Sequence, residues 1–388
     1  MKTKNVLGAM LLIAGTAVGG GILALPVETG MAGFIPSVVA MIVAWAFMTL
    51  TGLYYAEANL WLPEGAHVMT MASKLLGPLG KYTALILFLF IDYASLVAYN
   101  SGGGALVGHV LDIGRNGGFV LFALIFGCII AMGTKIVGRI NSLLMAGLIA
   151  AYFGLIGLGS MEVKTALFNV WGWKQMPYAL PLVLTTFSFQ MIVPSLTPYL
   201  NRDPKAIRLA VILGTTIPLV VYIIWQCIVL GIVSPDGLKQ AFVNGHAATE
   251  PLRGFIQSKW LGRIADSFAF FAIVTSYLGI GLSLYDFLSD SIKIKRKGVG
   301  KIFLCTLVVL PSLFFSIVYP RAFLVALEVT GGYGDSILNG LIPISMIWAG
   351  RYVKDLKGPL RIWGGKRALV LMALFSLFVI AIQTYNFF

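Results

Sequence analysis

Two apolar stretches of the chain contain glycine and proline residues where an uninterrupted helix would be expected. The first is AGTAVGGGILALP (14–26), which includes Gly15, three successive glycines and Pro26. The second is YALPLVLTTFSFQMIVPSLTPYL (178–200), which includes three prolines around a polar centre. Glycine and proline are the poorest residues for a helix interior. Both stretches therefore predict interrupted helices whose unpaired backbone groups are open to ligand chemistry.

This chemistry suits a zwitterion. Amide groups at the start of one half-helix, aided by the helix dipole, attract a carboxylate. Carbonyl groups at the end of the other half-helix, together with neighbouring hydroxyls, suit an ammonium group or a sodium ion. An amino acid carries both charges, so we expect the interruptions and one nearby helix face to bind it. The residues expected at this site are Ala14, Gly15, Thr16, Ala17, Gly19, Gly20, Gly21, Ser95, Tyr99, Phe187, Ser188, Phe189, Gln190 and Met191.

An alternative interpretation treats the glycines as close-packing positions and the prolines as kinks. Gly15 and Gly19 do have the four-residue spacing of a small-xxx-small packing face. Three successive glycines exceed what such a face needs, so interruption is the preferred interpretation. Phe187 and Phe189 flank the second interruption and are the best candidates to stack on an aromatic substrate.

Asp92 is an ionisable residue deep within a predicted helix. It lies about ten residues into the third apolar stretch, or roughly 15 Å along the helix, whereas most other acids lie near the ends of such stretches. An ionisable group at that depth is a functional-site candidate, and a carboxyl there suits proton coupling. Helical spacing places it on one face with Ser95, Leu96, Tyr99 and Gly103. The alternative is that Asp92 hydrogen-bonds a neighbouring helix and only holds the bundle together.

The composition is that of a polytopic membrane protein. Of the 388 residues, 59% are hydrophobic and 11% are charged, and the mean hydropathy is +0.91. Soluble domains are nearer one quarter charged. The formal net charge of +13 falls in short connections between apolar runs, and no basic stretch interleaved with aromatics indicates nucleic-acid binding. The three cysteines have no CxxC spacing, so neither a disulfide framework, a metal site nor another cofactor is indicated.

Eleven apolar runs are candidates to cross a hydrocarbon layer of about 30 Å. The run of residues 336–349 has the least certain start, because AFLVALEV precedes it before a GGYGD turn. The first run is expected to be a retained span and not a cleaved signal. The candidates are 5–28, 34–60, 82–110, 118–133, 140–160, 178–200, 209–233, 264–288, 302–318, 336–349 and 368–387.

The distribution of basic residues predicts an orientation for these spans. With the N-terminus inside, 20 of the 28 Lys and Arg residues fall in inside connections and eight fall outside. This asymmetry favours a cytoplasmic N-terminus and an external C-terminus. The longest external connection, 234–263, is expected to be either a gate over a vestibule or an irregular loop.

The two interrupted stretches occupy matching positions in two halves of the chain. Five spans separate their starts, which is the pattern of an inverted-repeat transporter. We therefore expect one transmembrane domain over 1–388. Its first repeat would cover about 5–160, its second about 178–349, and an extra helix about 368–387.

Four motifs resemble those of one known family. GTAVGGGILALP resembles the first-span signature GT-x-(I/V)-G-x-G-(I/M)-L-A-L-P of the hydroxy/aromatic amino acid permeases, the tyrosine and tryptophan permeases of bacteria. TTFSFQMIVPSLTPYL resembles their sixth-span TSFGFHGxxPSL, and TSYLGIGLSLYDFLSD (275–290) resembles their eighth-span TS-x-LG-x-x-LGL-(F/Y)-D-(F/Y)-L-x-D. LVAYNSGGG (96–104) resembles the third-span AY-x-SG-x-G. Gln190 and Met191 stand where the family commonly has His-Gly, which leaves the substrate and proton pathway open.

This resemblance implies the LeuT-type fold, in which two inverted repeats of five helices have discontinuous helices 1 and 6, and eleven helices in all. It also implies import of an aromatic amino acid through the bacterial inner membrane, usually by proton symport. Alternating access would rock spans 1, 2, 6 and 7 against spans 3, 4, 8 and 9. In sodium-coupled members of this fold, adjacent hydroxyls of span 8 bind the ion, so Thr275 and Ser276 indicate sodium as an alternative. The same hydroxyls could instead bond within their own helix.

Two other classes of function fit the sequence less well. An intramembrane enzyme needs clustered catalytic side chains, whereas the three histidines are scattered. A channel needs a repeated pore motif or rings of charge. The chain has no Walker A motif, so ATP is not the expected energy source. The sequence therefore predicts a secondary transporter with no catalytic residues, while its exact amino acid and oligomeric state stay open.

Overall fold

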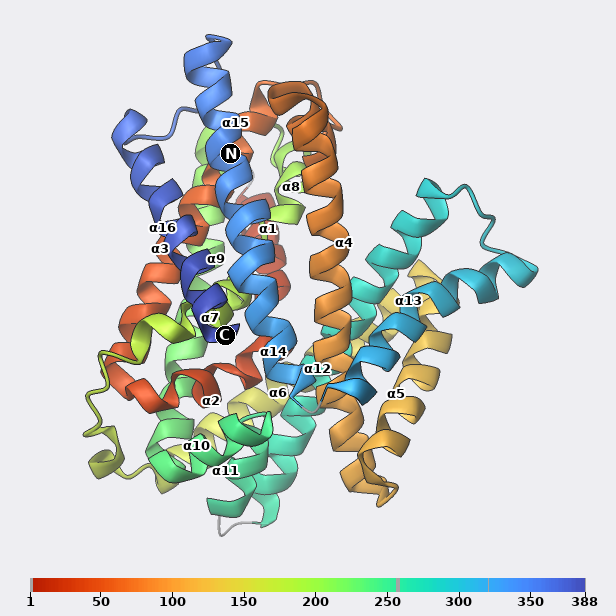
Figure 1. Cartoon of the computed structure of the whole chain (residues 1–388), viewed down its shortest axis with the longest axis vertical. Helices are drawn as coiled ribbons and strands as arrows, with labels where there is room; N and C mark the ends of the chain where they lie inside the picture. Colours follow the sequence, from red (N-terminus) through yellow and green to blue (C-terminus); the bar gives the residue numbers. More distant parts are fainter. Residues whose placement is uncertain (1–2, 256–258, 320, 388) are drawn as a thin grey trace.

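The computed structural model describes residues 3–255, 259–319 and 321–387, and every regular element within them is helical. Long helices run side by side along the longest axis of the molecule (Figure 1). Nine of the described helices are long and apolar enough to cross a membrane. A bent pair, Asn5–Ala17 and Gly20–Ala32, makes a tenth if it is counted as one span. The chain is therefore a multi-pass helical membrane protein, as its composition predicts.

Both predicted interruptions are present. Helix α1 stops before the successive glycines, and a second helical segment starts within them at Gly20, at an angle of 50° to the first. The second interruption falls between α7 and a short 3-10 turn, at residues 187–189. The segments of the two interrupted helices are α1 (Thr3–Ala17), η1 (Gly20–Leu23), α2 (Leu25–Thr29) and η2 (Gly30–Ala32), then η5 (Met176–Ala179), α7 (Leu180–Thr186), η6 (Gln190–Ile192) and α8 (Val193–Tyr199).

Eight further long helices agree with predicted spans to within a few residues, apart from α4. Helix α4 begins well before the predicted residue 82, because a first segment is joined to it through a kink at Gly77 (φ 80°) and Pro78. Two short 3-10 turns, η3 (Ser160–Glu162) and η4 (Thr165–Phe168), follow α6. The eight are α3 (Phe34–Leu60), α4 (Val68–Leu111), α5 (Gly114–Ala131), α6 (Thr134–Gly159), α9 (Pro204–Ile232), α12 (Lys259–Ser291), α13 (Gly298–Val318) and α16 (Gly365–Phe387).

The expected turn at GGYGD is wrong. The sequence lies inside a π-helix, η7 (Thr330–Leu341), which continues α14 (Ala322–Val329) and leads into α15 (Ile342–Trp348) and η8 (Ala349–Val353). Its glycines permit close packing, because a Cβ at Gly331 would collide with the carbonyl oxygen of Pro181 in α7. Backbone groups in an apolar surrounding must find partners, so the glycine-rich segment stays helical where a water-exposed segment would turn.

The long connection after α9 is also mostly helical. It forms α10 (Pro235–Asn244) and α11 (Thr249–Phe255), while residues 256–258 lie outside the described residues. The amide of Ala248 donates to the carbonyl of Leu23 (2.8 Å). The expectation of an irregular loop is therefore wrong for its larger part, and the connection packs directly on the first interrupted helix.

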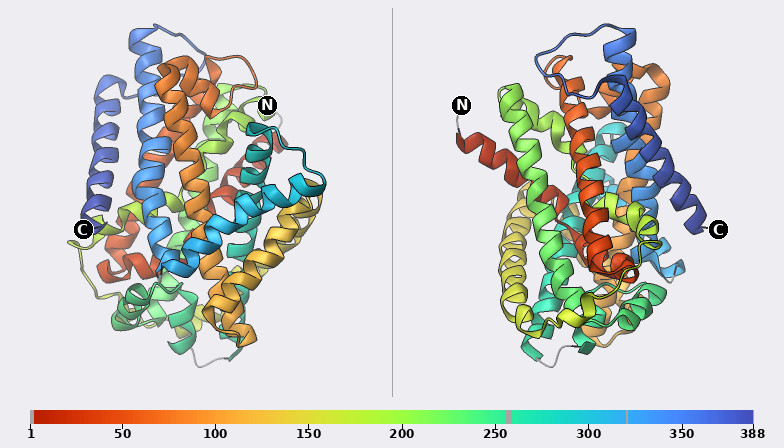
Figure 2. Two further views of the ribbon diagram at one scale, coloured as in Figure 1. Left: turned by 45° about the vertical axis from the view of Figure 1, so that its right-hand side comes forward. Right: turned by 90° about the vertical axis from the view of Figure 1, so that its left-hand side faces the viewer.

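Packing between distant segments brings the two interruptions together. The turn η1 lies against both α12 and α7, and α7 lies against η7. Helix α4 packs on α5, α12, α13 and α14, and α1 packs on α9. Figure 2 shows α1, in red, crossing α9, in green. The core thus holds both interruptions at the centre of the bundle.

Candidate functional site

A cavity of about 380 Å³ lies between the two interruptions. We call it the central cavity. Its walls come from the end of α1, the middle of α4, the start of α6, the second interruption, α12 and η7. Most residues expected from the sequence line it. These are Gly15, Thr16, Ala17, Gly19, Gly21, Asp92, Ser95, Tyr99, Ser188, Phe189, Met191, Thr275 and Ser276.

Four expected site residues do not line this cavity. Ala14 is buried in α1, and Phe187 packs edge-on against Tyr222, with ring centroids 5.1 Å apart. Gly20 holds the wall in place, because its amide donates to the Ser276 hydroxyl (3.1 Å). The fourth is Gln190. The interruptions are thus correctly located, although not every residue within them faces the cavity.

Gln190 turns away from the cavity toward α3. Its side-chain amide donates to the carbonyl of Met48 (3.1 Å) and to the hydroxyl of Thr51 (3.0 Å), and its side-chain oxygen accepts from the amide of Phe189 (2.9 Å). The side chain is fully buried. Gln190 therefore faces α3 and not the central cavity, and it caps the second interruption.

The first interruption presents backbone groups to the central cavity. The amides of Gly19 and Gly21 make no hydrogen bond with a described residue, and both glycines line the cavity. At the end of α1, the Ala17 carbonyl accepts from the Tyr222 hydroxyl (2.7 Å). The same hydroxyl lies 2.7 Å from the Thr186 carbonyl at the end of α7. One side chain therefore joins the two interruptions, and two amides stay open.

Asp92 reaches the central cavity together with Ser95 and Tyr99. The residue is 8% exposed, and its carboxylate oxygen Oδ2 is buried without a hydrogen-bond partner among the described residues. Leu96 and Gly103 share its helical spacing but lie elsewhere: Leu96 is buried, and Gly103 packs against the Phe122 ring of α5. The described contacts of Asp92 thus include no interhelical hydrogen bond of the kind that a purely structural role would require.

The two hydroxyls of α12 bond to their own helix. Thr275 donates to the carbonyls of Phe271 (2.8 Å) and Ala272 (3.1 Å), and Ser276 donates to that of Ala272 (2.9 Å). Ser276 also accepts from Gly20 of the first interruption. Such bonds leave oxygen lone pairs, so the pair can still contribute to an ion site.

The sequence interpretation missed Asp335. This fully buried residue of η7 lines the central cavity. One carboxylate oxygen accepts from the Ser188 hydroxyl (2.9 Å) and the Asn339 amide (2.6 Å), and the other has no partner among the described residues. The available signal was an acid directly before the tenth apolar run (336–349), where the sequence GGYGD indicated a turn.

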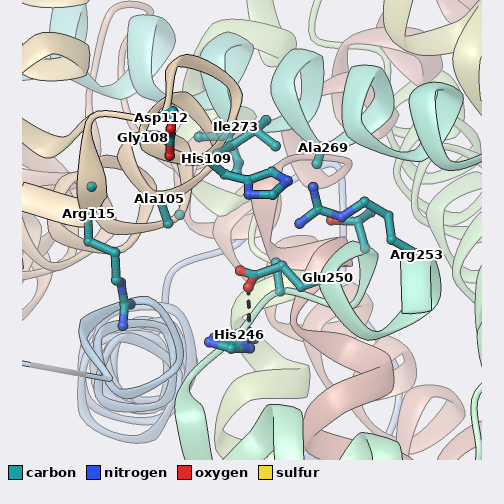
Figure 3. Close-up of a pocket in the computed structure, with 15 residues that line it drawn as sticks. Ala105, Gly108, His109, Asp112, Arg115, His246, Glu250, Arg253, Ala269 and Ile273 are labelled. Carbon is teal, nitrogen blue, oxygen red and sulfur yellow. Dashed lines mark ion pairs between the residues drawn. The ribbon is translucent and has the colours of Figure 1, made fainter. Parts of the chain in front are cut away.

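A second cavity, of about 330 Å³, lies beyond the central one. Figure 3 shows its polar lining, with His109 of α4 facing Arg253 of α11, and His246 paired with Glu250 (3.3 Å). Along α4 the central cavity extends from Phe88 to Tyr99, whereas the second cavity begins at Gly102.

About one helical turn separates the two cavities. Tyr99 and Ser276 line the central cavity, and Gly102 and Ile273, three residues away on the same helices, line the second. A Cβ at Gly20 would lie 2.6 Å from the Tyr99 ring, so the ring packs tightly on the first interruption. The barrier between the cavities is thin and made of side chains that rest on that interruption.

Comparisons with known proteins agree with this architecture. A sequence profile of the tryptophan/tyrosine permease family matches residues 2–383. The chain is 32% identical over 404 residues to the tryptophan-specific transport protein of Haemophilus influenzae, covering 98% of this chain and 96% of that protein. It is 30% identical to tyrosine-specific transport system 1 of the same organism (98% and 96% covered) and 30% identical to the tryptophan-specific transport protein of Pseudomonas aeruginosa (97% and 93% covered). The chain is thus a permease and not an enzyme, and it belongs to the tryptophan/tyrosine permease family.

Proposed function

We propose that this permease imports an aromatic amino acid, tryptophan or tyrosine, by proton symport through alternating access. The observation that carries the proposal is the central cavity, which lies between two interrupted helices and contains open amides beside buried carboxylates. Its volume of about 380 Å³ falls in the range of small-molecule sites. The names of the relatives supply the substrate class.

The cavity offers a distinct partner to each part of such a substrate. The amides of Gly19 and Gly21, at the start of a half-helix, suit the carboxylate. Phe189, Met191 and Tyr99 supply apolar and aromatic surface for the ring. The cavity therefore has partners for the carboxylate and for the aromatic ring of such an amino acid.

The arrangement of the two cavities supports alternating access. They lie on opposite sides of the Tyr99 barrier, and the central one extends toward the end of the bundle where α4 begins. The excess of Lys and Arg in the connections at that end favours a cytoplasmic position. We infer an inward-facing state, a cytoplasmic N-terminus and location in a bacterial inner membrane.

The matching interruptions also support a LeuT-type arrangement of eleven helices. Segments 5–160 and 178–349 would be two inverted repeats, and α16 would be the additional helix. The continuous helical path from Ala322 to Val353 supplies the tenth helix of this scheme. Movement of α1, α3, α7 and α9 relative to the remaining bundle would then open the second cavity and close the central one.

For the coupling ion we propose a proton carried by Asp92. Its carboxyl is buried beside the cavity without a described hydrogen-bond partner, and such a group is costly when ionised unless a cation neutralises it. Sodium is the second candidate, because Ser276 contacts the first interruption and Thr275 lies beside it in the same cavity.

Transport in proteoliposomes tests the proposal. We expect tryptophan or tyrosine to show saturable counterflow and to accumulate when a pH gradient alone is imposed. A sodium gradient alone should drive no uptake, and a competition panel of amino acids should place aromatic ones first. Absence of counterflow of every aromatic amino acid in the wild-type protein would refute the proposed transport function. Uptake that requires sodium would show that sodium, and not the proton, is the coupling ion.

The variant Asp92→Asn tests the coupling role. Removing the ionisable group should abolish accumulation driven by the pH gradient, while tryptophan exchange between the two sides continues, because exchange needs no net proton movement. Counterflow and gradient-driven uptake are measured on the same vesicles. Accumulation equal to that of the wild type would show that Asp92 has a structural role only.

A further inference from the structure

The charged side chains that line the central cavity are two carboxylates, Asp92 and Asp335. No Lys, Arg or His of the described residues lines it. An ionised carboxylate away from water is costly unless it is paired. The cavity therefore favours cationic groups, of which the transported amino acid brings one in its ammonium group.

The two carboxylates differ in their surroundings. Ser188 and Asn339 donate to one oxygen of Asp335 at 2.9 Å and 2.6 Å, and the Asn339 amide also lies 2.9 Å from the Ser188 hydroxyl. Asp92 has no such donors among the described residues. Hydrogen bonds to a carboxylate stabilise its charged form. Of the two carboxylates, Asp335 is thus the one with hydrogen-bond donors that stabilise a negative charge.

One oxygen of Asp335 has no hydrogen-bond partner among the described residues. The three-membered network with Ser188 and Asn339 fixes the orientation of the first oxygen. The second oxygen is buried and has no partner among the described residues, although the residue lines the cavity. Leaving a buried acceptor unpaired is unfavourable, so a donor supplied by a bound molecule would complete the site.

The π-helical conformation positions this carboxylate beside the second interruption. Helix α7 lies against η7 and α14. Within η7 the Ser336 hydroxyl donates to the carbonyl of Gly331, five residues earlier, in keeping with the wider turn. π-Helical turns inside α-helices occur frequently at functional sites. Asp335 consequently meets the end of the α7 half-helix, where backbone carbonyls also favour a cation.

We propose that Asp335 binds the α-ammonium group of the transported amino acid, and that Ser188 and Asn339 orient its carboxylate. The proposal rests on the proposed function and completes it. The ammonium group neutralises Asp335, the coupling proton neutralises Asp92, and the amides of Gly19 and Gly21 receive the substrate carboxylate. The two charges of the zwitterion and the charge of the coupling proton then each have one partner in the cavity.

A purely structural role for Asp335 makes a different prediction. If the carboxylate only ties η7 to the second interruption, its loss weakens binding of every ligand to the same extent. If it binds the ammonium group, its loss weakens only ligands that carry this group. A ligand pair that differs in the ammonium group alone separates the two roles.

The test compares tryptophan with 3-indolepropionate, which has the same ring and carboxylate but no amino group. Both are used as competitors of labelled tryptophan counterflow in proteoliposomes containing the full-length protein. In the wild type we expect tryptophan to compete about 100-fold better. In Asp335→Asn, which keeps the shape but removes the charge, we expect the two competitors to differ by less than about threefold, mainly through weaker tryptophan binding.

One variant serves as a control for the loss of a carboxylate. Asp290→Asn removes one at an exposed position at the end of α12, where Asp290 pairs with Arg296, and it should keep the wild-type preference for tryptophan. Asp92→Asn is a second test and not a control, because it removes the other carboxylate of the cavity. If Asp335 binds the ammonium group, tryptophan should still compete better than 3-indolepropionate in this variant. Loss of that preference in Asp92→Asn would assign the ammonium group to Asp92 and overturn the proposal.

The remaining outcomes also decide the question. Unchanged preference in Asp335→Asn, or an equal loss of affinity for both competitors, contradicts an ammonium site at Asp335. If Asp335→Asn does not fold, the wild-type measurement still stands: competitors that differ by less than about threefold would mean that the amino group is not recognised at all. Wild-type protein that carries no aromatic amino acid contradicts the proposed function itself, and the inference falls with it.

Discussion

The two interruptions differ in how their backbone is supported. At the first, between α1 and η1, the support comes from another helix, since the Ser276 hydroxyl accepts from the Gly20 amide (3.1 Å). At the second, between α7 and η6, a residue of the interruption itself supplies it, since the Gln190 side chain accepts from the Phe189 amide (2.9 Å). The first interruption keeps open amides beside the cavity, whereas the second is capped from within.

This difference indicates separate roles for the two halves of the site. The first interruption presents backbone to the central cavity, and the second presents the side chains of Ser188, Phe189 and Met191. The Tyr222 hydroxyl contacts the last helical carbonyls of both α1 and α7, at 2.7 Å each. The Tyr222 side chain therefore connects the two interruptions, while each of them lines the cavity with different groups.

The largest effect is expected from adding a methyl group to the first interruption. In Gly20→Ala the new Cβ would lie 2.6 Å and 2.8 Å from two atoms of the Tyr99 ring. Overpacking of a tight contact costs about 1–3 kcal/mol, so we expect the initial rate of tryptophan uptake to fall by about 10- to 100-fold. The matched control is Gly157→Ala in α6, where an added Cβ meets nothing within 4 Å. Normal uptake by Gly20→Ala would show that this contact is dispensable.

The positions of the interruptions could be predicted from the sequence because helix breaking is a local property of glycine and proline. Helical spacing likewise placed Asp92, Ser95 and Tyr99 at the cavity. The same spacing also included Leu96, because a helix face is broader than the part of it that meets a cavity.

The direction of a side chain and the close packing between distant segments could not be predicted from the sequence in the same way. Gln190 looked like a ligand residue, yet it turns toward Met48 and Thr51 of α3. Asp335 looked like part of a turn because GGYGD is rich in glycine. The structure instead has a π-helix there, in which Gly331 packs closely on Pro181, and this contact joins segments that are far apart in the chain. The missing information lies in tertiary packing and not in local propensity.

An intermediate effect is expected at the cap of the second interruption. Gln190→Leu keeps a similar volume but leaves the Phe189 amide without its partner and removes one of the two side-chain donors to the Met48 carbonyl, which keeps the Thr51 hydroxyl. We expect a loss of about 1–2 kcal/mol in the free energy of unfolding, seen as a lower melting temperature in detergent. The order of competing amino acids should not change. Gln240→Leu on the exposed surface of α10 is the control, and altered selectivity in Gln190→Leu would restore Gln190 as a ligand residue.

The smallest effect is expected where a side chain supports the first interruption from outside. Ser276→Ala removes the acceptor of the Gly20 amide, and because only this one hydrogen bond of the first interruption is lost, we expect the KM for tryptophan to rise only about two- to fivefold. Ser267→Ala is the matched control, since Ser267 donates to the carbonyl of Arg263 in the same helix but is exposed. A defect in Ser276→Ala that high sodium concentrations reverse would contradict the backbone role and support an ion site, because only a weakened ion site responds to the concentration of the ion.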